Sequence, residues 1–375
     1  MKKLGFGLMR LPLVDPDNVK SVDIELIKKM ADRFLEQGYT YFDTAYPYHE
    51  GYSETAFREV VVKRHPRDRY TLTDKMPTRF VKTAEDFDTF FEMQLKRCGV
   101  DYFDYYLLHN LNRERYKNMQ RLGGFDYIAR KKAEGRVLHT GFSFHDDSAL
   151  LEQILTDHPE VEYVQLQINY IDWDSPTIEA GKCYDVCCRH GKPVIVMEPI
   201  KGGSLAQVPE EALELMKEYA PDASPASWAI RYAASLDNVT VVLSGMSDLE
   251  QMEDNTAFMQ DFKPLNPDER KILHQVREII NSTRAIPCTA CRYCSPGCPM
   301  NIAIPEYFRI YNTLQQFDPE REWNNVETYY NNLIHTHGKP SDCIECGQCE
   351  AACPQHLPII EDLVKVSGIF ERSDR

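Results

Sequence analysis

The chain has 375 residues, of which 43% are hydrophobic and 27% are charged, a composition typical of a soluble globular protein. Its net charge of −15 argues against a nucleic-acid partner, because nucleic-acid-binding surfaces are basic. No run approaches 18 consecutive apolar residues, so we expect neither a membrane span nor a membrane partner. The length allows one large domain followed by a small one.

The N-terminal sequence MKKLGFGLMRLPL superficially resembles a signal peptide, because two lysines precede a short apolar stretch. It contains glycines and an arginine, and no small-residue cleavage site follows it before Asp15. We therefore expect a cytoplasmic protein. In that reducing compartment, the twelve cysteines predict metal ligands rather than disulfides.

The first 265 residues alternate short β-rich runs with helical runs. Residues 4–13 are predicted to form a small hairpin that plugs the N-terminal mouth of the domain. Helices are predicted at residues 22–37, 53–64, 84–98 and 225–234. Eight strands are predicted at residues 39–43, 70–75, 103–109, 137–143, 162–169, 192–198, 238–244 and 258–262.

Nearly continuous apolar strands that alternate with amphipathic helices indicate a parallel sheet covered by helices. Eight such units in this length favour a (β/α)8 TIM barrel, an α/β fold, over a doubly wound sheet. No GxGxxG follows the first strand, which weakens the dinucleotide-binding alternative further. We assign the barrel to residues 1–275.

Polar residues end several of the predicted strands, where barrel enzymes place their chemistry. Each has an ordinary explanation by itself: Asp43 could cap the next helix, and Lys75 could extend into solvent. Convergence of several ionisable groups on one rim is harder to explain in that way. The strand-end residues are Asp43, Lys75, His109, Ser143, Asn169 and Ser244.

Four segments, FDTAYPYHEGYSE, TLTDK, DYFDYYLLH and GFS, resemble the aldo-keto reductases in their order and separation. The resemblance spans roughly Leu4 to Leu265. It implies an NAD(P)-dependent enzyme that interconverts a small-molecule carbonyl and an alcohol. The implied catalytic tetrad is Asp43, Tyr48, Lys75 and His109.

The chemistry of these residue types agrees with that resemblance, because carbonyl reduction needs a hydride and a proton for the developing alkoxide. Tyr48 would donate the proton, and adjacent Lys75 would favour the ionised form of the phenol. Asp43 would pair with Lys75, and His109 would orient the substrate oxygen. Two neighbouring phenols compete for the role, but only Tyr48 has the family's spacing from Asp43.

The resemblance carries over only part of the cofactor site. Ser143 and Gln167 match positions that bind the nicotinamide carboxamide, although Phe144 replaces a frequent asparagine. Met197 stands where a stacking tyrosine is often found. The PIKGGSL loop offers a pyrophosphate contact through Pro199, Gly202, Gly203 and Leu205.

The segment SGMSDLEQMEDN resembles the adenosine-binding part of the family, and the positions concerned are Ser244, Gly245, Gln251 and Asn255. Gln251 replaces the arginine with which NADP-preferring members bind the 2′-phosphate. Asp248 and Asp254 would also repel a phosphate. Both NAD and NADP remain open, with a slight preference for NAD.

Two strings of the form CxxCxxCxxxCP hold eight of the twelve cysteines, at residues 288–299 and 343–354. This is the ferredoxin signature for 4Fe–4S clusters, in which the fourth cysteine ligates the other cluster. A zinc ribbon would explain neither the third cysteine nor the final proline. We therefore expect one cluster on Cys288, Cys291, Cys294 and Cys353, and a second on Cys343, Cys346, Cys349 and Cys298.

The sequence around the strings predicts helices at residues 304–317 and 324–338 and a third at 357–370. Residues 276–375 thus resemble a small α-helical ferredoxin-like domain. The other four cysteines lie in helical stretches and are expected to be buried: Cys98, Cys183, Cys187 and Cys188.

The barrel and the cysteine strings leave two functions open. The first is an NAD(P)-dependent carbonyl or alcohol oxidoreductase with two 4Fe–4S clusters, which serve a redox protein partner or hold the tail together. The alternative is an iron–sulfur electron-transfer module whose barrel is a scaffold for a partner or substrate, without nicotinamide turnover. Nicotinamide binding would discriminate between them.

Overall fold

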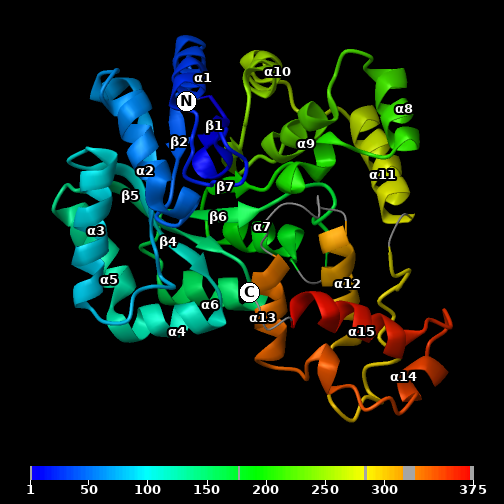
Figure 1. Cartoon of the computed structure of the whole chain (residues 1–375). Helices are drawn as coiled ribbons and strands as arrows, with labels where there is room; N and C mark the ends of the chain where they lie inside the picture. The colour runs from blue at the N-terminus through cyan, green and yellow to red at the C-terminus, as the bar shows by residue number, and fades with distance from the viewer. Residues whose placement is uncertain (1, 176–177, 283–284, 316–325, 372–375) are drawn as a thin grey trace.

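Eight parallel strands close into a barrel in the computed structural model, which describes residues 2–175, 178–282, 285–315 and 326–371 (Figure 1). Each strand pairs with the next along the chain, and the last pairs with the first. This confirms the predicted (β/α)8 architecture. The strands are β1 (Leu4–Gly7), β2 (Tyr41–Asp43), β3 (Thr71–Met76), β4 (Phe103–Leu111), β5 (Val137–Phe144), β6 (Tyr163–Gln167), β7 (Val194–Met197) and β8 (Val239–Ser244).

Two of the assignments made for the barrel strands and the N-terminal hairpin were wrong. Leu4–Gly7 is not part of a hairpin plug but the first barrel strand, between β2 and β8. Two glycines in four residues obscured the strand pattern in the sequence. The barrel nevertheless requires glycine at position 5, because a Cβ there would lie 2.8–3.0 Å from the side chains of Leu243, Val241 and Tyr41. Residues 258–260 lie in helix α10 (Leu249–Gln260) rather than in a strand, because its buried residues follow a helical spacing.

Helices surround the barrel (Figure 1), and the four predicted helical runs are confirmed, although the run at 53–64 is α-helical only to Phe57 and continues as a π-helix over Arg58–Val62. Polar side chains accept hydrogen bonds at the start of several helices, which fixes where those helices begin. The remaining helices are α1 (Ile24–Glu36), α2 (Tyr52–Phe57), α3 (Glu85–Cys98), α4 (Arg113–Leu122), α5 (Gly124–Ala133), α6 (Ser148–Asp157), α7 (Ala180–Arg189), α8 (Glu210–Tyr219), α9 (Pro225–Ala234) and α11 (Pro267–Ser282).

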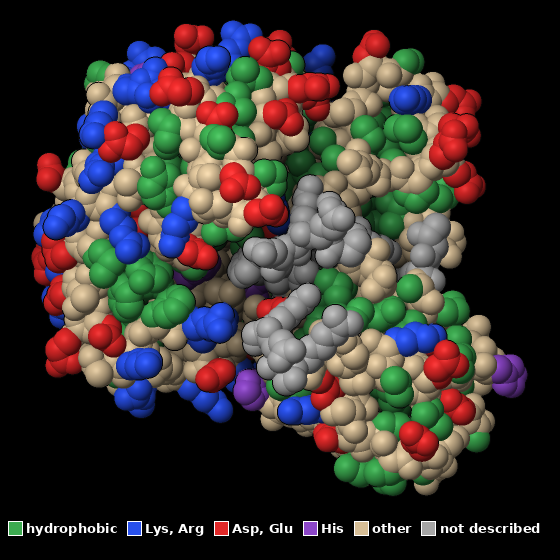
Figure 2. Space-filling model, viewed as in Figure 1, with side chains coloured by type: hydrophobic (Ala, Val, Ile, Leu, Met, Phe, Trp, Pro, Cys, Tyr) green, Lys and Arg blue, Asp and Glu red, His purple; other side chains and the backbone are tan. Residues whose placement is uncertain are grey.

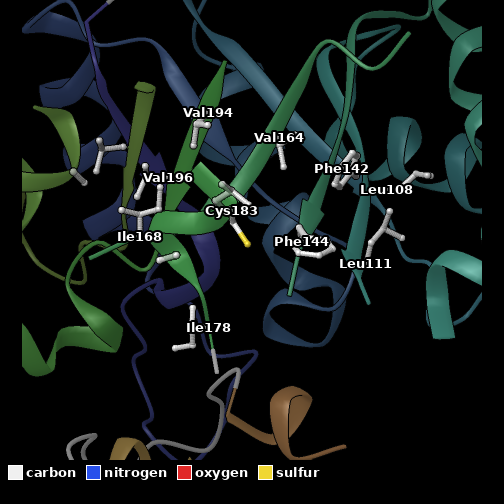
Figure 3. Packing of buried hydrophobic residues seen from close by; sticks show 14 of the residues in the cluster. Leu108, Leu111, Phe142, Phe144, Val164, Ile168, Ile178, Cys183, Val194 and Val196 are labelled. Atoms are coloured by element: carbon white, nitrogen blue, oxygen red, sulfur yellow. The ribbon is translucent and has the colours of Figure 1, made fainter. Parts of the chain in front are cut away.

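The strands separate two apolar layers, because successive side chains point to opposite faces. The inner layer comprises Tyr41, Leu107, Tyr163, Ile195, Val241 and Leu243. The outer layer packs under the helices, and Figure 3 shows part of it, including Phe142, Val164 and Val194. Asp43 is two residues after Tyr41 and therefore shares the inward face at the C-terminal end of β2.

The C-terminal tail forms a smaller helical unit beside the barrel (Figure 1). Its helices are α12 (Ile304–Gln315), α13 (Val326–Ile334), α14 (Gln348–Ala351) and α15 (Ile359–Phe370). The ring of Tyr330 stacks on Phe370 at 4.8 Å between centroids, which joins α13 to α15. The predicted boundary at residues 275 and 276 falls within α11.

The tail helices confirm the expected helical unit over the residues described, although α13 ends at Ile334, before the predicted His337. The predicted residues 316–317 and 324–325 lie outside the described residues. No helix in the described ranges is long and apolar enough to cross a membrane. Cys98, Cys183 and Cys187 are buried as expected. Cys188 is exposed, because it follows Cys187 on α7 and so lies on the side of the helix away from the buried face.

Candidate active site and cluster loops

The four residues of the expected tetrad meet at the C-terminal end of the barrel. Lys75 Nζ donates to Asp43 Oδ1, to the Thr44 carbonyl at 2.8 Å and to Tyr48 Oη at 3.3 Å. Asp43 and Lys75 are almost fully buried, at 3% and 1% exposure, whereas Tyr48 and His109 are only half-buried. The two buried residues thus support two residues that can be reached from outside.

The electrostatics of the site fix the charge of each member. Burial alone would lower the pKa of Lys75, but the Asp43 carboxylate and the Tyr48 hydroxyl raise it. Burial raises the pKa of Asp43, against the lowering effects of Lys75 and of the Gln165 amide. Lys75 is therefore a charged ammonium at neutral pH, paired with a carboxylate.

The phenol and the imidazole are both neutral near pH 7. Burial raises the pKa of Tyr48 above its ordinary value of 10.0, although the Lys75 ammonium lowers it in part. Lys75 acts in the expected direction, but burial outweighs it. Burial and the Lys75 charge hold the pKa of His109 well below 6.5. The His109 ring stands edge-on to Tyr48, with centroids 6.1 Å apart.

The loop that carries Tyr48 is held by a histidine that the sequence analysis did not single out. His49 has a left-handed backbone, with φ of 51°, which an L-residue adopts only at a cost. Its Nδ1 donates to the Val19 carbonyl at 2.7 Å, and its Nε2 accepts from the Leu11 N–H at 3.1 Å. Both contacts lie in the β1–α1 connection, so this segment positions the loop.

A cavity of about 200 Å³ lies beside the ends of β7 and β8. Most of the residues expected to contact the pyrophosphate and adenosine line it: Pro199, Gly202, Gly203, Ser244, Gly245, Gln251 and Asn255. Leu205 does not line the cavity but is buried in the apolar cluster with residues of α8, α9 and α11. Met197 is half-buried at the end of β7.

Arg10 also lines this cavity and pairs with Glu198 at 3.3 Å. The sequence analysis missed it because residues 4–13 were not recognised as a barrel strand and its loop. Arg10 could have been identified from the sequence as a single arginine in an apolar run. It follows a strand, and the C-terminal ends of barrel strands form the functional rim.

Two residues expected at the nicotinamide have free hydrogen-bonding capacity. Gln167 Nε2 donates to Asp172 at 2.9 Å, but Gln167 Oε1 is buried without a partner in the described structure. Ser143 Oγ accepts from the Asn110 N–H at 2.7 Å, which leaves its hydroxyl proton to donate. A carboxamide has one N–H donor group and one carbonyl acceptor, which match this acceptor and this donor. Its binding would also give Gln167 Oε1 a partner, and a buried polar atom without one is costly.

The two cysteine strings fold into matching loops. Cys298, Cys343, Cys346 and Cys349 line a single cavity, the set expected from crossed ligation. In the described residues no group of at least three His, Cys, Asp or Glu side chains is placed to hold a single metal ion, whereas these four thiols each line the one cavity. A 4Fe–4S cluster uses four separate thiolates in this way, one for each iron.

The thiols of the other set also approach one another. Burial raises the pKa of the Cys288 thiol, and the neighbouring thiols of Cys291 and Cys353 raise it further. Backbone N–H groups already point at sulfur: Ala290 donates to Cys288 and Ile302 to Cys298, each at 3.4 Å. Such hydrogen bonds stabilise cluster thiolates and tune their potential.

The backbone repeats between the strings at an interval of 55 residues. Left-handed φ values occur at Ala290, Arg292 and, two residues past the first string, Asn301, and at the equivalent Glu345, Gly347 and His356 of the second. Each non-glycine residue in this conformation costs about 1–2 kcal/mol. A strain repeated at equivalent positions indicates a shared requirement, and wrapping a loop around a cluster would supply one.

Comparison with known proteins places both parts of the chain. The family model described as "Aldo/keto reductase family" matches residues 3–278. This chain is a member of the aldo/keto reductase family. The model described as "4Fe-4S dicluster domain" matches residues 287–357 of the reductase. The recognition of both parts from their motifs is therefore confirmed.

Two curated relatives match different parts of the reductase. An aldo-keto reductase of Mycolicibacterium vanbaalenii is 28% identical over 222 residues, which cover 59% of this chain and 73% of the relative. One component of an ion-translocating oxidoreductase complex of Buchnera aphidicola is 30% identical over 86 residues, or 22% of this chain. The match spans only 14% of that component.

Solved structures share the barrel fold. The holo form of an aldo-keto reductase from Bacillus halodurans superimposes with a TM-score of 0.58 at 22% identity, covering 73% of this chain and 91% of the other. A Klebsiella pneumoniae aldo/keto reductase in complex with NADP and acetate gives 0.57 at 20% identity, with coverages of 73% and 91%. At these identities the likeness establishes the fold of the barrel.

Proposed function

We propose that this reductase interconverts a small-molecule carbonyl and an alcohol, with Tyr48 as the proton donor and NAD or NADP as the cofactor. The observation that carries the proposal is the position of Lys75 Nζ between Asp43 and the Tyr48 hydroxyl. This arrangement joins a neutral phenol to a buried cation, which lowers the cost of moving negative charge onto the phenol oxygen.

A bound nicotinamide would supply the hydride, and the residues of the chain would do the rest. Ser143 and Gln167 would hold the carboxamide through the donor and acceptor described above. Tyr48 would give its proton to the alkoxide as charge develops there. Neutral His109 would donate a hydrogen bond to the same oxygen and orient it.

The preference between NAD and NADP depends on the residues near the adenosine, because the two cofactors differ only in the 2′-phosphate of its ribose. Gln251 Nε2 donates to Asp248 at 2.8 Å, and its Oε1 accepts from the Ser247 N–H at 2.9 Å. A side chain bound in this way offers no cation to a 2′-phosphate, and Arg10, which lines the same cavity, is paired with Glu198. The geometry supports a modest preference for NAD.

The tail would hold two 4Fe–4S clusters with the fourth cysteine of each string exchanged between them. The shared cavity of Cys298 and the second string supports this crossing. Clusters carry single electrons, whereas nicotinamide carries a hydride, so the clusters would serve a redox protein partner or stabilise the tail. The similarity to one component of an oxidoreductase complex supports a partner.

A second function has a specific observation in its favour. Glu198 and Asp254 line the cofactor cavity, and Glu198 Oε2 is buried without a partner in the described structure. Carboxylates there would oppose a pyrophosphate. This favours an iron–sulfur electron-transfer module whose barrel binds a partner or substrate without nicotinamide turnover.

The Tyr48→Phe variant separates the two functions. Removal of the general acid should lower carbonyl reduction by about 10²–10⁴-fold while NADH or NADPH still quenches protein fluorescence. Tyr46→Phe is the matched control, because Tyr46 is on the same loop as Tyr48 but its ring packs against Phe80 and Phe90. Near-native activity of Tyr48→Phe would reject the assigned acid, and an absence of saturable cofactor binding would favour the electron-transfer module.

A further inference from the structure

A large cavity lies between the barrel rim and the tail. It has a volume of about 760 Å³ and contains His109 on one side. The opposite wall is α13 of the tail, through Thr328, Asn331 and Ile334. The cluster-bearing unit therefore helps to form the space in front of the proposed catalytic residues.

The lining of this cavity is basic, although the chain as a whole is acidic. Four lysine or arginine side chains line it, against two glutamates, in a chain with a net charge of −15. One of the glutamates, Glu114, is paired with His335 at 3.5 Å. Surface charges are interspersed over the barrel (Figure 2), so a basic lining at this position is not a general property. The four cations are Arg79, Lys82, Arg115 and Arg121.

Two of these cations hydrogen-bond to amide groups rather than to carboxylates. In the ranges that the structure describes, Arg115 Nη1 donates to Asn110 O at 2.9 Å and to Asn110 Oδ1 at 2.7 Å. Arg121 donates to the Asn118 amide at 2.7 Å. Burial lowers the pKa of Arg115, and the nearby Arg79 charge lowers it further. Like charges close to one another are stabilised when an anion binds between them.

Arg115 is also close enough to the catalytic residues to matter. It lines the same cavity as His109, and its charge, after burial, Lys75 and His145, lowers the pKa of His109. An anion bound by Arg115 would therefore lie near the imidazole that is proposed to orient the carbonyl oxygen. A substrate that spans the two points needs both a carbonyl and an oxyanion group.

We infer that the natural substrate is a carbonyl compound that carries a carboxylate or phosphate group, bound by Arg79 and Arg115 in the cavity that α13 helps to form. This inference rests on the proposed function and names its substrate class. Arginine binds both oxyanions in a bidentate manner. Asn331 and Thr328 of the tail provide further hydrogen-bonding groups on the facing wall.

Paired substrates test the inference. We expect kcat/KM to be higher for 4-carboxybenzaldehyde than for its methyl ester, or higher for glyceraldehyde 3-phosphate than for glyceraldehyde, and the pair that responds identifies the anion. In Arg79→Gln, the charged-to-neutral ratio of that pair should fall on the order of 10- to 100-fold. Arg79 is exposed, so this variant should fold.

The matched control is Arg130→Gln on α5, whose side chain pairs with Glu134 away from the cavity lining, and it should keep the wild-type ratio. Arg115→Lys should keep part of the ratio that Arg115→Gln loses. The inference is overturned if neither pair shows a preference for the charged member, or if Arg79→Gln leaves the ratio unchanged.

A binding measurement separates this inference from the proposed function. Titration calorimetry with 4-(hydroxymethyl)benzoate needs no turnover. Binding that weakens on the order of tenfold in Arg79→Gln, in a protein that reduces no carbonyl, would support the anion site and reject the reductase activity. Reduction of neutral carbonyls with equal binding to wild type and variant would reject the anion site and leave the activity standing.

Discussion

The barrel and the tail of this chain are stabilised in different ways. The barrel has an inner apolar layer within a closed sheet and an outer layer under its helices. The tail holds eight of the cysteines, and its left-handed non-glycine residues lie in or just after the two cysteine strings. We therefore expect packing to stabilise the barrel, and ligation of clusters to contribute to the stability of the tail loops.

The two parts are nevertheless physically joined. Asn332 of α13 donates to the His145 carbonyl at 3.0 Å and accepts from the Asn112 amide at 2.8 Å. The buried side chains of the tail belong to the same apolar cluster as the outer layer of the barrel. A change in the tail can therefore reach the cavity beside His109, which α13 lines.

Removal of iron should have the largest effect, and it should destabilise the tail but not the barrel. With the clusters gone, the strained loops lose what holds them, so the tail should become fully sensitive to protease while the barrel resists. Limited proteolysis with mass spectrometry of the full chain measures this, and reconstitution with iron and sulfide should restore resistance. A tail that remains resistant after iron removal would mean that packing alone stabilises it.

Cys298→Ala should produce a smaller, local effect. Because Cys298 lines the cavity of the second string, the cluster on Cys343, Cys346 and Cys349 should become labile, while the other cluster persists. Iron content and cluster-resolved spectra measure this. Cys188→Ala, at an exposed cysteine outside the strings, should keep both clusters. Loss confined to the cluster of the first string would show that ligation is not crossed.

Gln251→Arg should change the cofactor preference without changing the fold. A charge-assisted hydrogen bond to the 2′-phosphate is worth about 1.5–3 kcal/mol, so the affinity for NADPH relative to NADH should rise by about one to two decades. Gln153→Arg on α6, outside the residues that line the cavity, is the matched control. An unchanged ratio would place the adenosine elsewhere or assign the dominant effect to Asp248 and Asp254.

The smallest effect expected is that of pH on carbonyl reduction. The pKa of His109 lies well below 6.5, so the imidazole is neutral above that range, and the pKa of Tyr48 lies above 10.0, so the phenol stays protonated below it. The profile of kcat/KM should therefore be flat within about twofold from pH 6.5 to 8. A titration step within this window would show that one of these environments changes when substrate binds.

The sequence predicted most of the barrel and missed its beginning for a definable reason. Apolar runs such as residues 103–109 are long enough to identify a strand locally. Leu4–Gly7 is short and half glycine, and only the closed barrel explains why Gly5 must stand there. The run at 258–262 was assigned to a strand from its composition, but Met259 belongs to the buried face of α10 and the helix continues to Gln260.

The sequence by itself identified the functional residues that lie close to one another in the chain, because their spacing forms a recognisable motif. The CxxCxxCxxxCP strings identify a cluster domain because the ligands of one loop are close in the chain, and Asp43 and Tyr48 share one loop. Only the tertiary structure decided what lies opposite them. Arg10, Arg115 and α13 reach their sites from distant parts of the chain, and such contacts leave no local pattern in the sequence. Barrel closure and the docking of the tail bring them together.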